Sequence, residues 1–153
     1  MRCWRICRQR YAAAARSSEG SYLYGGRWNS RGVRIVYAST SLALAAIETF
    51  VNLEPHLQPR DLVSIEAEIP EDVEVEKVSL KLLPAHWHRS RDESMHRFGD
   101  DWIRSGRTVA LLVPAATIPG EWNVLLNPVH GEFSRIKFGA PKPFEFDVRM
   151  FRG

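Results

Sequence analysis

The chain has few cysteines and no long uncharged hydrophobic run. Only Cys3 and Cys7 occur in 153 residues, and one C-x3-C pair lacks the second ligand pair of a structural zinc site. The longest nearly uncharged stretch, Ser41 to Leu53, contains Glu48 and Asn52 and is shorter than the roughly 18 apolar residues of a membrane span. Charges also interrupt the first eight positions, where a signal peptide carries its apolar core. These absences predict reduced thiols, no membrane helix and a cytoplasmic protein.

Histidine is also sparse, which argues against a metal centre. His86 and His88 flank Trp87, but no cysteine or second histidine pair lies at ligand spacing, so a plain loop is favoured and no metal is expected. The composition, 44% hydrophobic and 25% charged, is typical of a globular domain. Because no repeat or linker-like segment occurs, we expect one domain over residues 1–153.

Charge is unevenly distributed along the chain. Residues 1–34 carry eight arginines and one acid, a net charge of +7. Because the whole chain carries +3, the remaining residues carry −4. Arginine binds phosphate oxygens in bidentate fashion, so this segment suggests a phosphate-bearing ligand. Residues 61–76 instead carry seven acids and no Lys or Arg, which disfavours direct binding of nucleic acid. Ordinary solvated surface remains the alternative for both segments.

The hydrophobic patterning predicts a sheet-rich α+β domain. Expected strands are residues 4–7, 34–39, 63–69, 73–78, 108–113, 122–126, 135–138 and 144–146. Expected helices are residues 41–53, with Thr40 or Ser41 as N-cap, and 92–105, with Gly106 just past the end; a helical turn is expected over residues 11–15. The glycine-rich segment Gly20 to Gly32 is expected to be loop.

Three segments carry candidate functional residues. Arg27 follows Gly25 and Gly26, so a guanidinium can reach a phosphate beside closely packed backbone, although a plain hairpin turn fits as well. Glu48 is the only acid within residues 41–53 and lies on a narrow polar stripe; it could line a cleft, but the helical wheel alone favours solvent exposure. Asn123, Asn127 and His130 could bind a ligand, although structural turns are the favoured reading.

Taken together, these segments resemble the RES domain family. The matching motifs are Trp4-Arg5-Ile6, Gly25-Gly26-Arg27-Trp28-Asn29, Val36-Tyr37-Ala38-Ser39, Leu44-Ala45-x-x-Glu48 and Glu121-Trp122-Asn123-Val124-Leu125-Leu126-Asn127-Pro128-x-His130, in the family's order and spacing. The resemblance implies a fold related to ADP-ribosyltransferases. It also implies a toxin that consumes NAD, is neutralised by an Xre-type helix-turn-helix antitoxin and forms a homodimer.

The resemblance also implies roles for individual residues. Arg5 and Arg27 are the NAD-contacting arginines, with Asn123 as a further NAD-binding residue. Tyr37 is the aromatic at the nicotinamide end and Glu48 the catalytic carboxylate. These residue types suit the chemistry, because breaking the bond between nicotinamide and ribose leaves positive charge on the sugar, which a carboxylate stabilises. Paired arginines suit the pyrophosphate, and a flat aromatic side chain can stack on nicotinamide.

The chain departs from the family pattern at two positions. Ala115 stands where a serine often occurs, and Gly131 where a proline often follows the histidine. The missing hydroxyl leaves reduced or altered activity open, and the sequence does not show what accepts ADP-ribose, so three functions remain. The expected one is degradation of NAD by hydrolysis or phosphorolysis; the alternatives are ADP-ribosylation of a protein and a catalytically weak module that binds an antitoxin.

Overall fold

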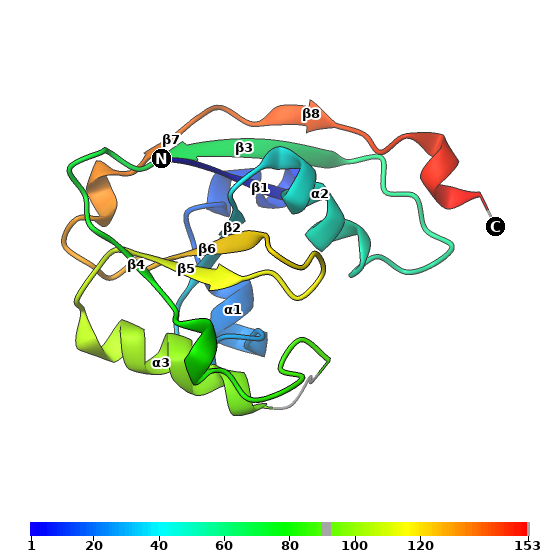
Figure 1. The fold of residues 1–153 in the computed structure, drawn as a ribbon. Coiled ribbons are helices and arrows are strands. Elements are labelled where there is room, and N and C mark those ends of the chain that lie inside the picture. The colour runs from blue at the N-terminus through cyan, green and yellow to red at the C-terminus, as the bar shows by residue number, and fades with distance from the viewer. Residues whose placement is uncertain (90–92, 153) are drawn as a thin grey trace.

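The computed structural model describes residues 1–89 and 93–152, and its centre is one eight-stranded sheet (Figure 1). The strand order is β4-β5-β6-β2-β1-β3-β7, and β8 also pairs with β3. All strand pairs are antiparallel except β4 with β5. The strands are β1 (Arg2–Arg8), β2 (Val36–Ser39), β3 (Leu62–Glu68), β4 (Val75–Lys77), β5 (Ala110–Pro114), β6 (Trp122–Leu126), β7 (Lys137–Phe138) and β8 (Lys142–Phe144). The expected sheet-rich α+β fold is confirmed.

Three α-helices accompany the sheet: α1 (Glu19–Tyr24), α2 (Leu42–Phe50) and α3 (His96–Ser105). The Oγ atom of Ser41 accepts a hydrogen bond from the backbone N–H of Leu44, so Ser41 is the N-cap of α2. Gly106 ends α3 in the left-handed conformation, with φ of 59°. Short 3-10 helices span Gln9–Ala14, Leu80–Leu82, Glu93–Met95, Phe133–Arg135 and Val148–Phe151.

Several expected boundaries were wrong. The glycine-rich segment is not all loop, because α1 occupies Glu19–Tyr24 and ends at Gly25, whose φ of 72° favours glycine. The last strand is Lys142–Phe144, and Phe146 beyond it is buried against other aromatic rings. A 3-10 turn precedes α3, which begins at His96, and the expected start at Asp92 lies outside the described residues.

The sheet is apolar on both faces. Successive residues 35–38 point in turn into two different hydrophobic cores. Val36 and Ala38 pack with Cys3, Ala67 and the residues around them on one face. Ile35 and Tyr37 point to the opposite face. There the core consists of Trp28, Ile35, Met95, Trp102, Leu111, Val113 and Leu125, with Tyr37 packed against it.

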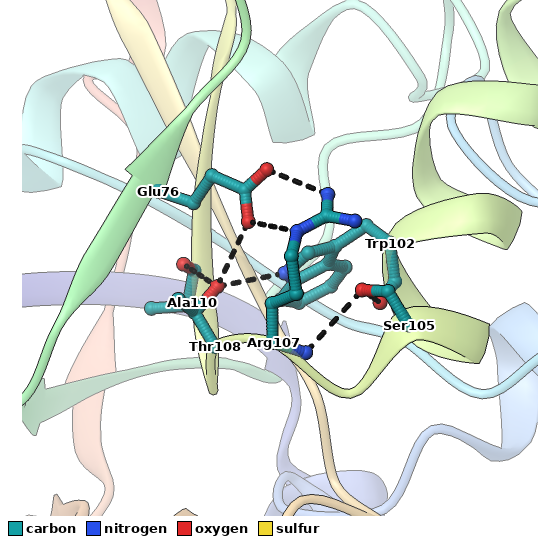
Figure 2. Close-up of polar contacts among 6 residues, drawn as sticks. All are labelled: Glu76, Trp102, Ser105, Arg107, Thr108 and Ala110. Atoms are coloured by element: carbon teal, nitrogen blue, oxygen red, sulfur yellow. Dashed lines mark hydrogen bonds and ion pairs between the residues drawn. The ribbon is translucent and has the colours of Figure 1, made fainter.

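Polar contacts at the end of α3 attach this helix to β4 and β5 (Figure 2). The buried Thr108 hydroxyl accepts a hydrogen bond from the Trp102 indole N–H at 2.9 Å and donates to the carbonyl of Ala110 at 3.1 Å. Arg107 binds both carboxylate oxygens of Glu76 in the same cluster. These contacts attach the end of α3 to the sheet, and Figure 1 shows the helix below β4 and β5.

The sheet is weakly joined at its centre, between β1 and β2. Trp4 opposite Ser39 is the one residue pair that connects these strands in the described part of the chain. By contrast, β1 pairs with β3 over seven residues and β2 with β6 over four. The two halves of the sheet are therefore joined by little backbone pairing between β1 and β2, which leaves the carbonyl of Tyr37 in β2 able to accept from a side chain.

Strand pairing brings the basic and acidic segments together. Arg2 forms an ion pair with Glu66, and Arg8 with Asp61, across the β1 and β3 region. The strong charge asymmetry along the sequence is thus partly neutralised in space, and these two arginines are engaged by carboxylates. Among residues 1–89 and 93–152, no helix is long and apolar enough to cross a membrane.

Candidate functional site

Glu48 lies on the polar stripe of α2, in the second turn of the helix, and is held by neutral hydrogen-bond donors. Thr117 Oγ1 donates to Glu48 Oε1 at 2.9 Å, and Asn123 Nδ2 donates to the same oxygen at 2.7 Å. The side chain is half-buried, so the solvent-exposed position that the helical wheel favoured is wrong. The exposed large hydrophobic side chains of this helix region are Leu42 and Val51. A half-buried carboxylate with neutral donors can stabilise a neighbouring cation.

Asn123 is fixed from its other side. Its Oδ1 accepts a 2.7 Å hydrogen bond from the hydroxyl of Ser39, which lies directly opposite Asn123 in the pairing of β2 with β6. Ser39 is buried, and Asn123 is half-buried. The amide therefore has one orientation, with its oxygen toward Ser39 and its nitrogen toward Glu48.

Tyr37 lies two residues before Ser39 on the same strand, so its side chain emerges on the same face of the sheet. Its hydroxyl donates to Asn29 Oδ1 at 2.6 Å and accepts from the backbone N–H of Trp28 at 3.2 Å. Burial raises the pKa of Tyr37 well above its usual value, so the phenol stays neutral. Because the hydroxyl is engaged in the protein, the aromatic ring is the part of Tyr37 that can contact a ligand.

Glycine at position 26 allows this arrangement of Tyr37. A Cβ atom at Gly26 would lie 2.6 Å from the Tyr37 hydroxyl oxygen and 3.0 Å from Asn29 Oδ1. Asn29 is fully buried, and its Nδ2 donates to the carbonyls of Ser21, Ser30 and Val33. The glycine-rich segment is therefore a rigid support for Tyr37.

Arg5 lies where β1 and β2 separate. Its Nη1 atom donates to the backbone carbonyl of Tyr37 at 3.2 Å, while its buried Nε has no hydrogen-bond partner among the described residues. Burial lowers the pKa of this guanidinium, and the nearby Cys7 thiol partly offsets the effect. A buried donor without a partner is rare, and it suggests that the contacts of Arg5 are completed by something outside the chain.

Arg27 lies close to the same tyrosine. Its Nη1 donates to the carbonyl of Trp87 at 3.2 Å, and its positive charge counteracts the burial that raises the pKa of Tyr37. The adjacent Trp28 is buried and contacts the Trp87 ring, with centroids 5.7 Å apart. Arg27 is thus placed by its own segment and by the loop before α3.

The structure brings most of the expected site residues into one region. Asn123 contacts Glu48 directly, and Ser39 connects this pair to the strand that carries Tyr37. Arg5 and Arg27 approach Tyr37 from its backbone and from its phenol end, respectively. Asn127 is buried and caps its own turn, since its Oδ1 accepts from the N–H of Val129, in agreement with the structural reading. His130 likewise accepts from the N–H of Glu132.

Sequence reasoning missed Thr117 and gave no role to Ser39 and Asn29. Ala115, at the position of the expected serine, is buried, and its N–H donates to the carbonyl of Glu121. The hydroxyl that reaches Glu48 comes from Thr117, two residues later. Residues 116–118 form a bend after β5, so no strand or helix period in the sequence indicated that Thr117 would reach Glu48. No group of three or more His, Cys, Asp or Glu side chains that could hold a metal ion occurs among residues 1–89 and 93–152.

Comparison with known proteins identifies the family. The model of the RES domain matches residues 2–147. The chain belongs to the RES domain family. The RES domain thus covers all of β1 to β8, including each residue of the site described above.

Curated relatives match over nearly the whole length of this RES protein. A "Prs ADP-ribosylating toxin" from Sphingobium sp. (strain YBL2) is 38% identical, over 97% of this chain and 96% of the relative. A "Toxin Res" from Yersinia enterocolitica is 34% identical, over 98% of this chain and 99% of the relative. The crystal structure of the Mycobacterium tuberculosis MbcT-MbcA toxin-antitoxin complex contains a chain with the same fold, at a TM-score of 0.70 and 15% identity, covering 94% of this chain and 84% of that one.

Proposed function

We propose that this protein is a toxin that cleaves the bond between nicotinamide and ribose in NAD. The observation that carries the proposal is the Glu48 carboxylate, which receives two hydrogen bonds on one oxygen and lies on the face that also holds Tyr37. The names of the curated relatives, which are toxins, support the biological role.

The proposed chemistry follows from the charge that develops during the reaction. As the C–N bond breaks, nicotinamide leaves as a neutral molecule and the ribose carbon becomes positive. Glu48 stabilises that positive charge, as a carboxylate does in glycoside cleavage. The Tyr37 ring stacks on nicotinamide, Arg5 and Arg27 bind the pyrophosphate, and Asn123 holds the carboxylate. No metal takes part in this proposal.

The acceptor of ADP-ribose distinguishes three reactions. Water gives ADP-ribose, inorganic phosphate gives ADP-ribose phosphate, and a protein side chain gives an ADP-ribosylated protein. Attack by water or phosphate is the proposed reaction. Protein modification is the second candidate, and the name of the Sphingobium relative favours it. A catalytically weak module is the third candidate, suggested by Ala115, although the Thr117 hydroxyl beside Glu48 argues for a working site.

A partner protein belongs to the same proposal. The structural relative was solved as a toxin-antitoxin complex, which supports an antitoxin that neutralises this chain. We propose an Xre-type helix-turn-helix protein as that antitoxin, and a homodimer of this chain that acts in the cytoplasm. Co-expression of the two proteins followed by size-exclusion chromatography with light scattering measures both associations.

Nicotinamide release by purified protein tests the reaction. We expect release from NAD by the wild type, and a loss of about 100-fold or more in Glu48→Gln with NAD binding retained. Glu54→Gln is the matched control, because Glu54 is an exposed acid just beyond α2 and should leave release unchanged. Dependence on phosphate separates phosphorolysis from hydrolysis, and transfer of labelled ADP-ribose to a protein indicates modification. Equal release by wild type and Glu48→Gln would refute the role of Glu48.

A further inference from the structure

The carboxylate of Glu48 is held asymmetrically. Both described donors, Thr117 Oγ1 and Asn123 Nδ2, bind Oε1, and no hydrogen bond to Oε2 is found within residues 1–89 and 93–152. Two donors on one oxygen restrict rotation of the carboxylate plane, because turning it would break both bonds. The second oxygen is thereby left for a ligand.

The two donors come from different parts of the β5 to β6 hairpin. Asn123 is in β6, opposite Val113 of β5, and its amide is set by Ser39. Thr117 lies in the connection between the two strands, where the N–H of Ala115 still continues the ladder to Glu121. The connection between β5 and β6 therefore contacts the Glu48 carboxylate of α2 through Thr117, which lies outside the family motifs quoted above.

We infer that Thr117 is a positioning residue for Glu48, supplying through its own hydroxyl the donor that this chain lacks at Ala115. Ala115 follows Val113 by two residues, so its side chain is on the face of Asn123, and a methyl group there offers no hydrogen bond. Thr117, two residues further, provides a hydroxyl at hydrogen-bond distance. The inference rests on the proposed function, in which Glu48 stabilises the cationic transition state.

Loss of the Thr117 hydroxyl should affect turnover of NAD more than its binding. A carboxylate held by one donor instead of two samples several orientations, and fewer of them place Oε2 against the reacting carbon. Because the hydroxyl of Thr117 donates its hydrogen bond to Glu48, its loss should lower kcat and leave KM nearly unchanged. A merely structural threonine would instead lower the amount of folded protein, with kcat and KM of the folded fraction unaltered.

Three variants test the inference in the full-length protein. We expect Thr117→Val to lower kcat for nicotinamide release about 10- to 100-fold, with KM for NAD within about twofold, because the lost bond is one to a charged group. Thr117→Ser keeps the hydroxyl and should restore kcat to within about threefold of the wild type. Thr49→Val is the matched control, since the Thr49 hydroxyl donates to the carbonyl of Ala45 within α2 and does not contact Glu48.

Crystal structures of the wild type and Thr117→Val separate failure of the inference from failure of the proposed reaction. We expect one Glu48 orientation in the wild type and several orientations in the variant. Wild-type kcat in Thr117→Val, or an equal fall in Thr117→Val and Thr117→Ser, would overturn the inference. If the wild type releases no nicotinamide, the proposed reaction is wrong, and a single unchanged Glu48 orientation in Thr117→Val would then overturn the inference as well.

Discussion

The Nδ2 atom of Asn123 donates a 2.7 Å hydrogen bond to Oε1 of Glu48, although 75 residues separate them in the sequence. Two features of the fold produce this contact. Helix α2 follows β2 directly, and the register of β2 with β6 sets Ser39 opposite Asn123. A helix that returns over its own strand thereby meets a side chain of the neighbouring strand.

Replacing the amide donor of Asn123 with an acceptor should impair catalysis. Asn123→Asp replaces the donor with a carboxylate oxygen at hydrogen-bond distance from Glu48, and two like charges repel each other at that distance. We expect kcat for nicotinamide release to fall about 100-fold or more. Ser39→Ala removes only the bond that orients the amide and should cost less, about three- to tenfold. Steady-state kinetics on both variants measures the difference, and equal losses would contradict the proposed order.

Removal of the Tyr37 hydroxyl should affect stability more than chemistry. Tyr37→Phe leaves the buried Asn29 Oδ1 and the N–H of Trp28 without this partner, which costs about 1–3 kcal/mol of unfolding free energy. Because the ring remains, NAD turnover at a temperature well below Tm should stay within about threefold. Tyr37→Leu removes the ring as well and should raise KM for NAD. Urea unfolding and kinetics on the two variants separate these effects.

Arg5 should contribute to NAD binding. Arg5→Lys keeps a positive charge but loses the planar group that donates to the carbonyl of Tyr37, so we expect KM for NAD to rise about tenfold. Arg8→Lys is the matched control on the same strand, because Arg8 is paired with Asp61 at the surface. Binding of NAD measured by isothermal titration calorimetry checks the assignment, and equal affinities in the two variants would contradict it.

Gly99 allows α3 to approach the segment that supports Tyr37. A Cβ atom at Gly99 would lie 2.0 Å from the carbonyl oxygen of Trp28 and 3.0 Å from Ile35 Cδ1. We expect Gly99→Ala to lower the unfolding free energy by about 3 kcal/mol, because the helix must move away from Trp28. Gly131→Ala, where no atom lies within 4 Å of the added Cβ, should leave Tm unchanged. Differential scanning calorimetry on both variants tests this contrast.

Burial of Cys3 should make the protein less stable at alkaline pH. Burial raises the pKa of this thiol from 9.0 to about 12. Between these values the unfolded chain loses the proton while the folded protein keeps it, so fewer protons are bound in the unfolded state and stability falls as pH rises. The slope is about 1.4 kcal/mol per pH unit for one proton. Urea unfolding from pH 8 to 11 should show a shallower decline in Cys3→Ala than in the wild type.

Local patterns in the sequence predicted the elements that depend on neighbouring residues. Turn residues at Pro119-Gly120 and Asn127-Pro128 bound the predicted strand 122–126, and β6 has these same bounds. Ser41 and Gly106 supply a cap at the start of α2 and at the end of α3, and both ends were expected. Helix α1 was missed because glycine and serine favour turns, whereas Asn29 and Ser21 hold this segment through contacts that only the folded chain forms.

Motifs and periodicity along the chain were sufficient to predict the family and the sheet-rich fold and to name the candidate site residues. The surroundings of each candidate residue became visible in the folded chain alone. Glu48 is half-buried because α2 packs beside a hairpin distant in sequence, and Thr117 reaches it because that hairpin extends past its last paired residues. Both contacts depend on strand register and helix placement, which are set by long-range packing and leave no periodic signal in the sequence.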